Sequence, residues 1–196
     1  MEVAEKTLAE FLDSYNFAWR RNAFMLIAQE LCALERPVMI CETGCMRAPN
    51  QPDHEFEDGQ STLVWDYLAT MTGGKAISID MNPENCAYAR ERVGPNTTIY
   101  EANSIQFLSN AEFEHKIDLL YLDSMDYTKQ TAFHSALNHA GELAAAWEHL
   151  ESGAIVAVDD CIGPYNGKHA LVKCFFEILG GVLPSGISHI SWWKKP

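Results

Sequence analysis

The fold is decided by a short stretch near the N-terminus, Val38-Met-Ile-Cys-Glu-Thr-Gly44. A run of apolar residues that ends in an acid and a glycine is typical of a buried strand of a parallel sheet followed by a tight turn. Similar apolar runs recur downstream and alternate with segments of helical pattern. Because helices that connect parallel strands cover both faces of the sheet, the sequence predicts an α/β fold with a doubly wound, mostly parallel sheet.

The predicted elements alternate along the chain. We expect strands over residues 38–42, 76–80, 97–101, 117–123 and 154–159, and helices over 61–71, 83–93, 104–108, 128–150 and 168–179. Apolar residues at helical spacing between about 6 and 34 predict one or two amphipathic helices ahead of the sheet. Residues 181–193 are expected to add a strand pair with an antiparallel edge strand. We expect Trp192 and Trp193 to pack on this edge or to form a homodimer contact, with stacking on the substrate as the alternative.

Length and charge limit the classes of function. The 196 residues suit one domain, with N-terminal helices in 1–36 and the sheet core in 37–196. The formal net charge of -13 opposes general binding to nucleic acid or anionic membranes, which requires clustered Lys and Arg. We find no signal-peptide pattern, no apolar run of transmembrane length and no Cys-x-x-Cys pair, so we expect a cytoplasmic protein with reduced thiols.

Acidic residues recur at the ends of the predicted strands. The carboxyl ends of parallel strands meet at one edge of an α/β sheet, and ligands bind beyond that edge. A row of carboxylates there is unfavourable unless a cation or a hydroxyl-rich ligand binds. These acids are Glu42, Asp80, Asp123, Asp159 and Asp160.

The turn after the first strand also suggests a ligand. Gly44 allows the backbone to turn tightly beside a bound group, and Ser61 opens a helix whose free N–H groups suit an anion. The dinucleotide pattern G-x-G-x-x-G is absent, which counts against an NAD-dependent dehydrogenase. Asp80 stands where nucleotide-binding folds keep an acid for ribose hydroxyls, although it is also placed to cap the helix over 83–93.

The order of these motifs resembles that of class I S-adenosylmethionine (SAM)-dependent methyltransferases. The chain is most similar to the small O-methyltransferase branch, which includes catechol, caffeoyl-CoA and macrolide-sugar enzymes. The resemblance implies a Rossmann-like fold and methyl transfer to a small hydroxylated acceptor, with a divalent metal assisting. An NAD-dependent dehydrogenase and a non-catalytic SAM- or metal-binding module remain alternatives. The resemblance covers residues 38–179 and is carried by Glu42-Thr-Gly44, Asp80, Asn103-Ser104, Asp118–Asp123 and Val158-Asp159-Asp160.

The resemblance also implies roles for single residues. Asp123, Asp159 and Asp160 fall where this branch keeps its divalent-metal ligands, and oxygen ligands favour Mg²⁺, Mn²⁺ or Ca²⁺. Asp123 is assigned to the cofactor site as well. The other cofactor residues are Glu42 and Gly44 at the methionine end, Ser61 at the methionine carboxylate, Asp80 at the ribose, and Asn103 and Ser104 beside the adenine.

Two features depart from the family. The connection over residues 45–58 is much longer than the family's; it is either a lid or part of the substrate pocket, or an acidic insertion. Catechol-type enzymes carry a Lys three residues after the acid of the fourth strand, and this chain carries Asp126 there. Asp126 is therefore our candidate for the catalytic base, with a helix cap near Thr128 as the alternative. His169 is a second candidate base, with a surface or cap role as its alternative.

Overall fold

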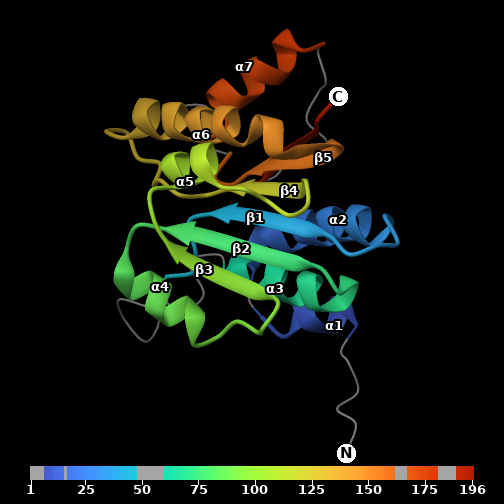
Figure 1. Cartoon of the computed structure of the whole chain (residues 1–196). Helices are drawn as coiled ribbons and strands as arrows, with labels where there is room; N and C mark the ends of the chain where they lie inside the picture. Colours follow the sequence, from blue (N-terminus) through green and yellow to red (C-terminus); the bar gives the residue numbers. More distant parts are fainter. Residues whose placement is uncertain (1–6, 16, 48–59, 162–166, 181–188) are drawn as a thin grey trace, which may run out of the picture.

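Six strands form a single sheet in the order β3-β2-β1-β4-β5-β6 (Figure 1). The computed structural model describes residues 7–15, 17–47, 60–161, 167–180 and 189–196. The first five strands are parallel, and β6 pairs with β5 in the antiparallel sense. The predicted Rossmann-like sheet with an antiparallel edge strand is thus confirmed. The strands are β1 (Met39–Thr43), β2 (Lys75–Asp80), β3 (Thr97–Glu101), β4 (Ile117–Leu122), β5 (Leu150–Val158) and β6 (Ser191–Lys194).

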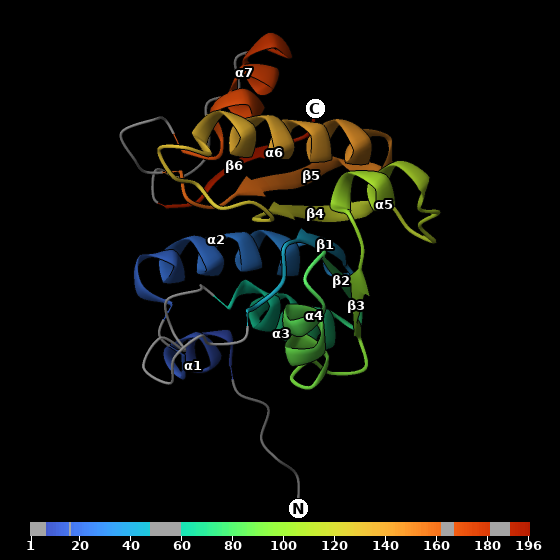
Figure 2. The ribbon, with the colours of Figure 1, turned by 90° about the vertical axis from the view of Figure 1, so that its left-hand side faces the viewer.

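Helices lie on both faces of the sheet (Figures 1 and 2). One apolar core joins α1, α2 and α3 to one face, and a second core joins α5, α6 and α7 to the other. The helical segments are α1 (Leu8–Asp13), η1 (Ala18–Arg20), α2 (Arg21–Cys32), α3 (Ser61–Thr72), α4 (Pro83–Arg90), α5 (Ser104–Asn110), α6 (Ala132–Ala146), η3 (Trp147–His149) and α7 (Ala170–Ile178). Within the described ranges, no helix combines the length and apolar character that a membrane crossing requires.

The N-terminal helices are part of the main core rather than a loose appendage. Phe24 of α2 meets Trp65 of α3 edge-on at a ring-centroid distance of 5.5 Å, and Trp65 lies 4.9 Å from Tyr121 of β4. All three side chains are fully buried. Aromatic contacts of this kind add to the free energy of burial, so the extension is held firmly against the sheet.

The C-terminal tryptophans pack on the sheet edge, as the first of the predicted alternatives has it. Neighbouring residues of a strand face opposite sides. Trp192 accordingly joins the core beneath α2 and α3, and Trp193 stacks on Phe176 of α7 at 5.3 Å. Both indoles are buried within this chain, so they do not offer a dimer surface. The other half of the predicted strand pair falls in residues 181–188, outside the described part.

The strand order changes direction between β1 and β4. From β1 the chain continues to β2 on one side, and from β4 it continues to β5 on the other. The ends of the two strands are tied together because the Asp123 N–H donates to the Thr43 carbonyl oxygen at 2.9 Å. Such a switch point leaves a crevice beyond the strand ends, which is where α/β sheets bind ligands.

Candidate active site

Two adjoining cavities open at this switch point. One, of about 180 Å³, lies beside Ser61, Asp123 and Lys168. The other, of about 210 Å³, lies beside Asn103 and Ser104. Gly44, Asp80 and Ser124 line both. The cavities therefore share one wall at the strand ends. We refer to them as the first and the second cavity.

Gly44 brings the two central loops into contact. Its φ is +80°, in the region that favours glycine. A β-carbon at this position would lie 2.7 Å from the Asp123 carbonyl oxygen, which is closer than non-bonded atoms can approach. The loops after β1 and β4 can therefore close over the strand ends only because this residue has no side chain.

Asp80 lies at the boundary between the two cavities. Its carboxylate accepts a hydrogen bond from the Cys45 N–H at 3.2 Å and one from the Asn82 N–H at 2.7 Å. The cap of α4 is Asn82, whose side-chain oxygen accepts from the Glu84 N–H at 2.8 Å. The helix-cap alternative for Asp80 is therefore wrong. The carboxylate instead holds the turn after β1 and faces the site.

Glu42 does not line the cavity, contrary to expectation. Its side chain points from β1 toward α3 and is fully buried. The carboxylate accepts hydrogen bonds from Ser61 at 2.6 Å, from Thr62 at 2.7 Å and from Ser78. Burial raises its pKa to about 7, although the three hydroxyl donors partly oppose the shift. Glu42 thus anchors the start of α3, and Ser61 lines the first cavity while its hydroxyl proton points to Glu42.

The second cavity contains the residues expected beside an adenine. Asn103 caps α5 by accepting a hydrogen bond from the Gln106 N–H at 3.0 Å. Ser104 donates to Glu142, a fully buried acid of α6. Glu142 also accepts from Thr43 at 3.0 Å and from Ser124 at 2.5 Å, so it ties α6 to the loops around the site. Sequence reasoning missed Glu142, whose signal was an acid within the apolar pattern of a helix.

The three acids expected to bind a metal do gather at the ends of β4 and β5, but each has a cationic partner. Lys168 donates to Asp123, and its Nζ lies 3.0 Å from Oδ2 of Asp160. Nε of Arg20 lies 2.7 Å from Oδ2 of Asp159, and Nη2 of Arg20 lies 3.0 Å from Oδ1 of Asp160. We call these five side chains the charged cluster. Neither cation was identified from the sequence, because Arg20 comes from the N-terminal helices and Lys168 from beyond the loop after β5.

Burial and ion pairing have opposite effects on the pKa values of the charged cluster: burial favours the neutral form of each group, and pairing favours the charged form. Burial raises the pKa of Asp159 to about 6, and the nearby Asp123 carboxylate adds to the shift. Burial also disfavours the charge on Lys168, but the carboxylates of Asp123 and Asp160 outweigh it and raise its pKa. The pKa of Asp160 is lowered because Lys168 and Arg20 outweigh its burial. Burial raises the pKa of Asp123 as well, although Lys168 and Arg20 oppose the shift. The two cations therefore remain charged, and they counteract the effect of burial on the acids.

The acids of the charged cluster do not fit a divalent metal in this arrangement. Across the described residues, no group of three or more His, Cys, Asp or Glu side chains is arranged to hold an ion. The carboxylates already accept hydrogen bonds from Lys168 and Arg20, and Asp159 also accepts one from Tyr121 at 2.9 Å. The metal site expected at Asp123, Asp159 and Asp160 therefore stays a prediction, and in this structure the three acids are paired with side chains of the chain itself.

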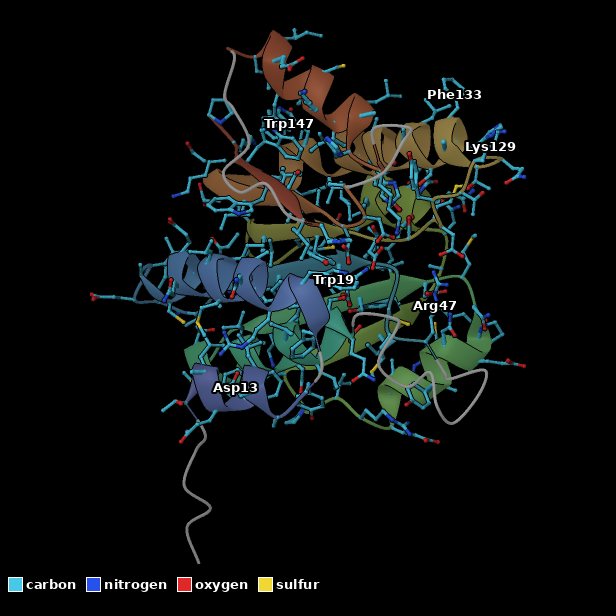
Figure 3. All side chains as sticks on the ribbon, turned by 180° about the vertical axis from the view of Figure 1, so that it is seen from behind. Asp13, Trp19, Arg47, Lys129, Phe133 and Trp147 are labelled. Atoms are coloured by element: carbon cyan, nitrogen blue, oxygen red, sulfur yellow. The ribbon has the colours of Figure 1, made fainter. Side chains whose placement is uncertain are left out.

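The two candidate bases differ in their access to the site. Asp126 lines the first cavity and pairs with Arg47, whose hydrogen bond lowers the pKa of that carboxyl. Arg47 lies toward the same end of the molecule as Lys129 (Figure 3). His169 lines neither cavity. It packs 6.3 Å from the Trp193 ring, and burial lowers its pKa. Of the long connection over 45–58, only its first three residues belong to the described part.

Comparison with known families agrees with this geometry. A family model described as a methyltransferase domain matches residues 56–161, more than half of the chain. The chain belongs to this methyltransferase domain family. The matched part of the methyltransferase includes all elements from α3 to β5 and contains Asp80, Asp123 and Asp160. The match favours a methyltransferase over the dehydrogenase alternative. Among curated proteins, none matches this chain.

Several solved structures share the fold of the methyltransferase. A crystal structure of an O-methyltransferase from Klebsiella pneumoniae has a TM-score of 0.58 and 18% identity, over 89% of this chain and 80% of that one. The O-methyltransferase NovP has a TM-score of 0.63 and 11% identity, over 89% and 78% of the two chains. MycE, from the mycinamycin biosynthetic pathway and in complex with Mg, SAH and mycinamycin VI, has a TM-score of 0.67 and 14% identity; 98% of this chain matches 55% of MycE.

Proposed function

We propose that the methyltransferase transfers a methyl group from SAM to a hydroxyl oxygen of a small polar acceptor. The observation that carries the proposal is the pair of adjoining cavities at the switch point, which share Gly44 and Asp80. Solved structures of similar fold support it, since two of them are described as O-methyltransferases and MycE was solved with SAH.

In this proposal SAM extends across both cavities and, when bound, supplies a methyl group on its electrophilic sulfur. Asp80 at the shared wall accepts hydrogen bonds from the ribose hydroxyls. Asn103 and Ser104 lie beside the adenine in the second cavity. In the first cavity, the N-terminus of α3 at Ser61 offers backbone N–H groups to the methionine carboxylate, because the first turn of a helix leaves these donors free. Asp123 lines the same cavity.

The acceptor binds in the first cavity, whose side chains are mostly charged. Arg47, Asp126 and Lys168 all line it, so a polar acceptor is favoured over an apolar one. Arg47 lowers the pKa of Asp126, so its carboxylate is ionised near neutral pH and has oxygens that can accept the hydroxyl proton as methyl transfer proceeds. The same pairing makes it a weaker base than an unpaired carboxylate. His169 is not proposed as the base because it lines neither cavity.

Calorimetric titration with SAM tests the proposal. We expect the wild type to bind SAM with a dissociation constant in roughly the micromolar range of enzyme ligands. Asp80→Ala is expected to weaken binding by about tenfold or more, because the lost hydrogen bonds leave ribose hydroxyls without a partner. Glu101→Ala is the matched control, since Glu101 pairs with Asp80 in the register of β2 and β3 but is exposed and lines neither cavity.

Two outcomes would contradict the proposal. A wild type that does not bind SAM would exclude the cofactor. Binding without transfer of a labelled methyl group to any member of a broad panel of hydroxylated acceptors would instead favour a non-catalytic SAM-binding module.

A further inference from the structure

We infer that the methyltransferase carries its own replacement for a divalent cation, formed by the ammonium of Lys168 and the guanidinium of Arg20, and that removing Lys168 converts the charged cluster into a divalent-metal site. The inference depends on the proposed function only for the position of the acceptor, which faces this cluster across the first cavity. The two cations of the chain can balance most of the negative charge of the three neighbouring acids.

The position of Lys168 is the first argument. Its side chain is 1% exposed, and its ammonium bridges Asp123 and Asp160, which follow the adjacent strands β4 and β5. A hard cation bound by these two acids would take the same place, because carboxylate oxygens converge there. Lys168 also lines the first cavity, so its positive charge faces the bound acceptor.

The charge balance is the second argument. When all three are ionised, Asp123, Asp159 and Asp160 contribute three negative charges, and Lys168 and Arg20 contribute two positive ones. One negative charge remains, as it would if a divalent ion bound the three acids alone. A metal ion that entered the present cluster would have to displace Lys168 and Arg20 from their ion pairs. This would leave their charges without partners in a largely buried place, which is costly in free energy.

The backbone is folded so as to place Lys168 in the charged cluster. Gly167 has a φ of +67°, and a β-carbon there would lie 2.5 Å from the Asp160 carbonyl oxygen. The Lys168 N–H donates to that same oxygen at 3.2 Å. The backbone at Gly167 and Lys168 is therefore in close contact with the backbone at Asp160. This contact holds the Cα of Lys168 close to Asp160. A lysine on the surface would not need a glycine with positive φ before it.

Electron paramagnetic resonance of Mn²⁺ tests the inference on the full-length chain. The signal of free aqueous Mn²⁺ decreases when the ion binds, so the bound fraction is measured directly. For the wild type we expect no stoichiometric binding. For Lys168→Gln we expect one Mn²⁺ per chain, with affinity at least about tenfold above that of the wild type, because the repulsive charge of Lys168 is gone and its partners Asp123 and Asp160 no longer pair with it. Adding Asp160→Asn to this variant should abolish the new binding.

Lys173→Gln is the matched control. Lys173 lies five residues away on α7, is exposed, and pairs only with Glu177 at 3.8 Å among the residues described. This substitution should leave Mn²⁺ binding at the wild-type level. Arg20→Gln removes the other positive charge of the cluster and should also increase Mn²⁺ affinity, which keeps the inference testable if Lys168→Gln does not fold.

The outcomes separate this inference from the proposed function. Stoichiometric Mn²⁺ binding by the wild type that is lost in Asp160→Asn would overturn the inference. A folded Lys168→Gln variant, verified by circular dichroism, that gains no Mn²⁺ affinity would overturn it too. SAM binding is measured in a separate titration with EDTA present, so a failure there contradicts the proposed function and leaves the Mn²⁺ result standing.

Discussion

At the scale of single residues, Glu42 shows how a side chain supports the site without lining either cavity. Its carboxylate joins Ser78 of β2 to Ser61 and Thr62 at the start of α3. The same Thr62 hydroxyl oxygen accepts a hydrogen bond from the Met46 N–H at 2.8 Å. The buried acid Glu42 is therefore linked to the turn after β1 through the Thr62 hydroxyl. The protonation of Glu42 affects the stability of the fold.

Glu42 should make the protein less stable as the pH rises. Its pKa is raised from 4.5 to about 7 on folding, so between these values the folded state binds more protons than the unfolded state. The free energy of unfolding therefore decreases from pH 4.5 to pH 7, by at most about 3 kcal/mol for this group. Asp159, with its pKa raised to about 6, contributes in the same direction.

Urea unfolding of Glu42→Gln between pH 5 and pH 8 measures this contribution. The variant should show a shallower decrease in unfolding free energy than the wild type, because its amide does not titrate. Glu101→Gln, at the exposed end of β3, should keep the wild-type slope. Equal slopes in the wild type and Glu42→Gln would show that Glu42 is not the titrating group.

Single residues of the site were only partly predictable from the sequence. Asp80 and Asp123 were identified because an acid directly after an apolar run marks a strand end. The direction of the Glu42 side chain could not be predicted. Both faces of a parallel sheet are buried, so the residues of β1 show no alternation of apolar and polar types that would indicate which face each side chain occupies. Arg20 and Lys168 were missed because their partners are more than 40 residues away in the sequence, and a charge alone does not indicate its partner.

At the scale of elements, the turn after β1 depends on a glycine for steric reasons. Gly44 and Gly153 both have a φ of +80°, but only at Gly44 would a β-carbon meet other atoms. Both Gly→Ala changes are expected to cost about 1 kcal/mol from the backbone conformation. Gly44→Ala should cost about 1–3 kcal/mol more, because the loops after β1 and β4 must separate.

Chemical denaturation of the two variants separates the cost of the backbone conformation from the cost of the steric clash, with Gly153→Ala as the internal control. Gly44→Ala should also weaken SAM binding, since Gly44 lines both cavities. A Gly44→Ala variant as stable as Gly153→Ala would show that the close approach to Asp123 is easily relieved.

Most elements were predictable because apolar runs and helical spacing give strong local signals. The boundaries around α6 were not. Residues 128–131 form a turn in which the Thr128 and Thr131 hydroxyls each accept a hydrogen bond from the other residue's N–H, so α6 begins only at Ala132. Strand β5 begins already at Leu150, because Leu150 pairs with Ile117 at the start of β4. Both differences come from contacts that the local pattern does not show.

At the scale of the whole molecule, one guanidinium joins the N-terminal helices to the active site. Arg20, at the end of η1, donates to Asp159, which is almost fully buried. Its neighbour Arg21 pairs with Asp13 on the surface. Two adjacent arginines thus form ion pairs of very different burial, and they provide a matched comparison.

Arg20→Ala should lower the free energy of unfolding by about 3–5 kcal/mol, because it leaves a buried carboxylate without its partner. Arg21→Ala should cost less than about 1 kcal/mol, since exposed ion pairs are screened by water. Urea denaturation with fluorescence of the buried tryptophans measures both. A single transition in each variant would support the predicted single domain, whereas a separate early transition for the N-terminal helices would contradict it.

The division of the helices between the two faces also determines where the protein can be labelled. Its six cysteines are all unpaired; Cys41, Cys45, Cys86 and Cys161 are buried, while Cys32 and Cys174 are exposed. Cys32 ends α2 on one face, and Cys174 lies in α7 on the other. The native sequence therefore provides two attachment points for a donor and an acceptor fluorophore on opposite sides of the sheet. Energy transfer between them would report whether the two helical layers shift when SAM binds, without any engineered cysteine.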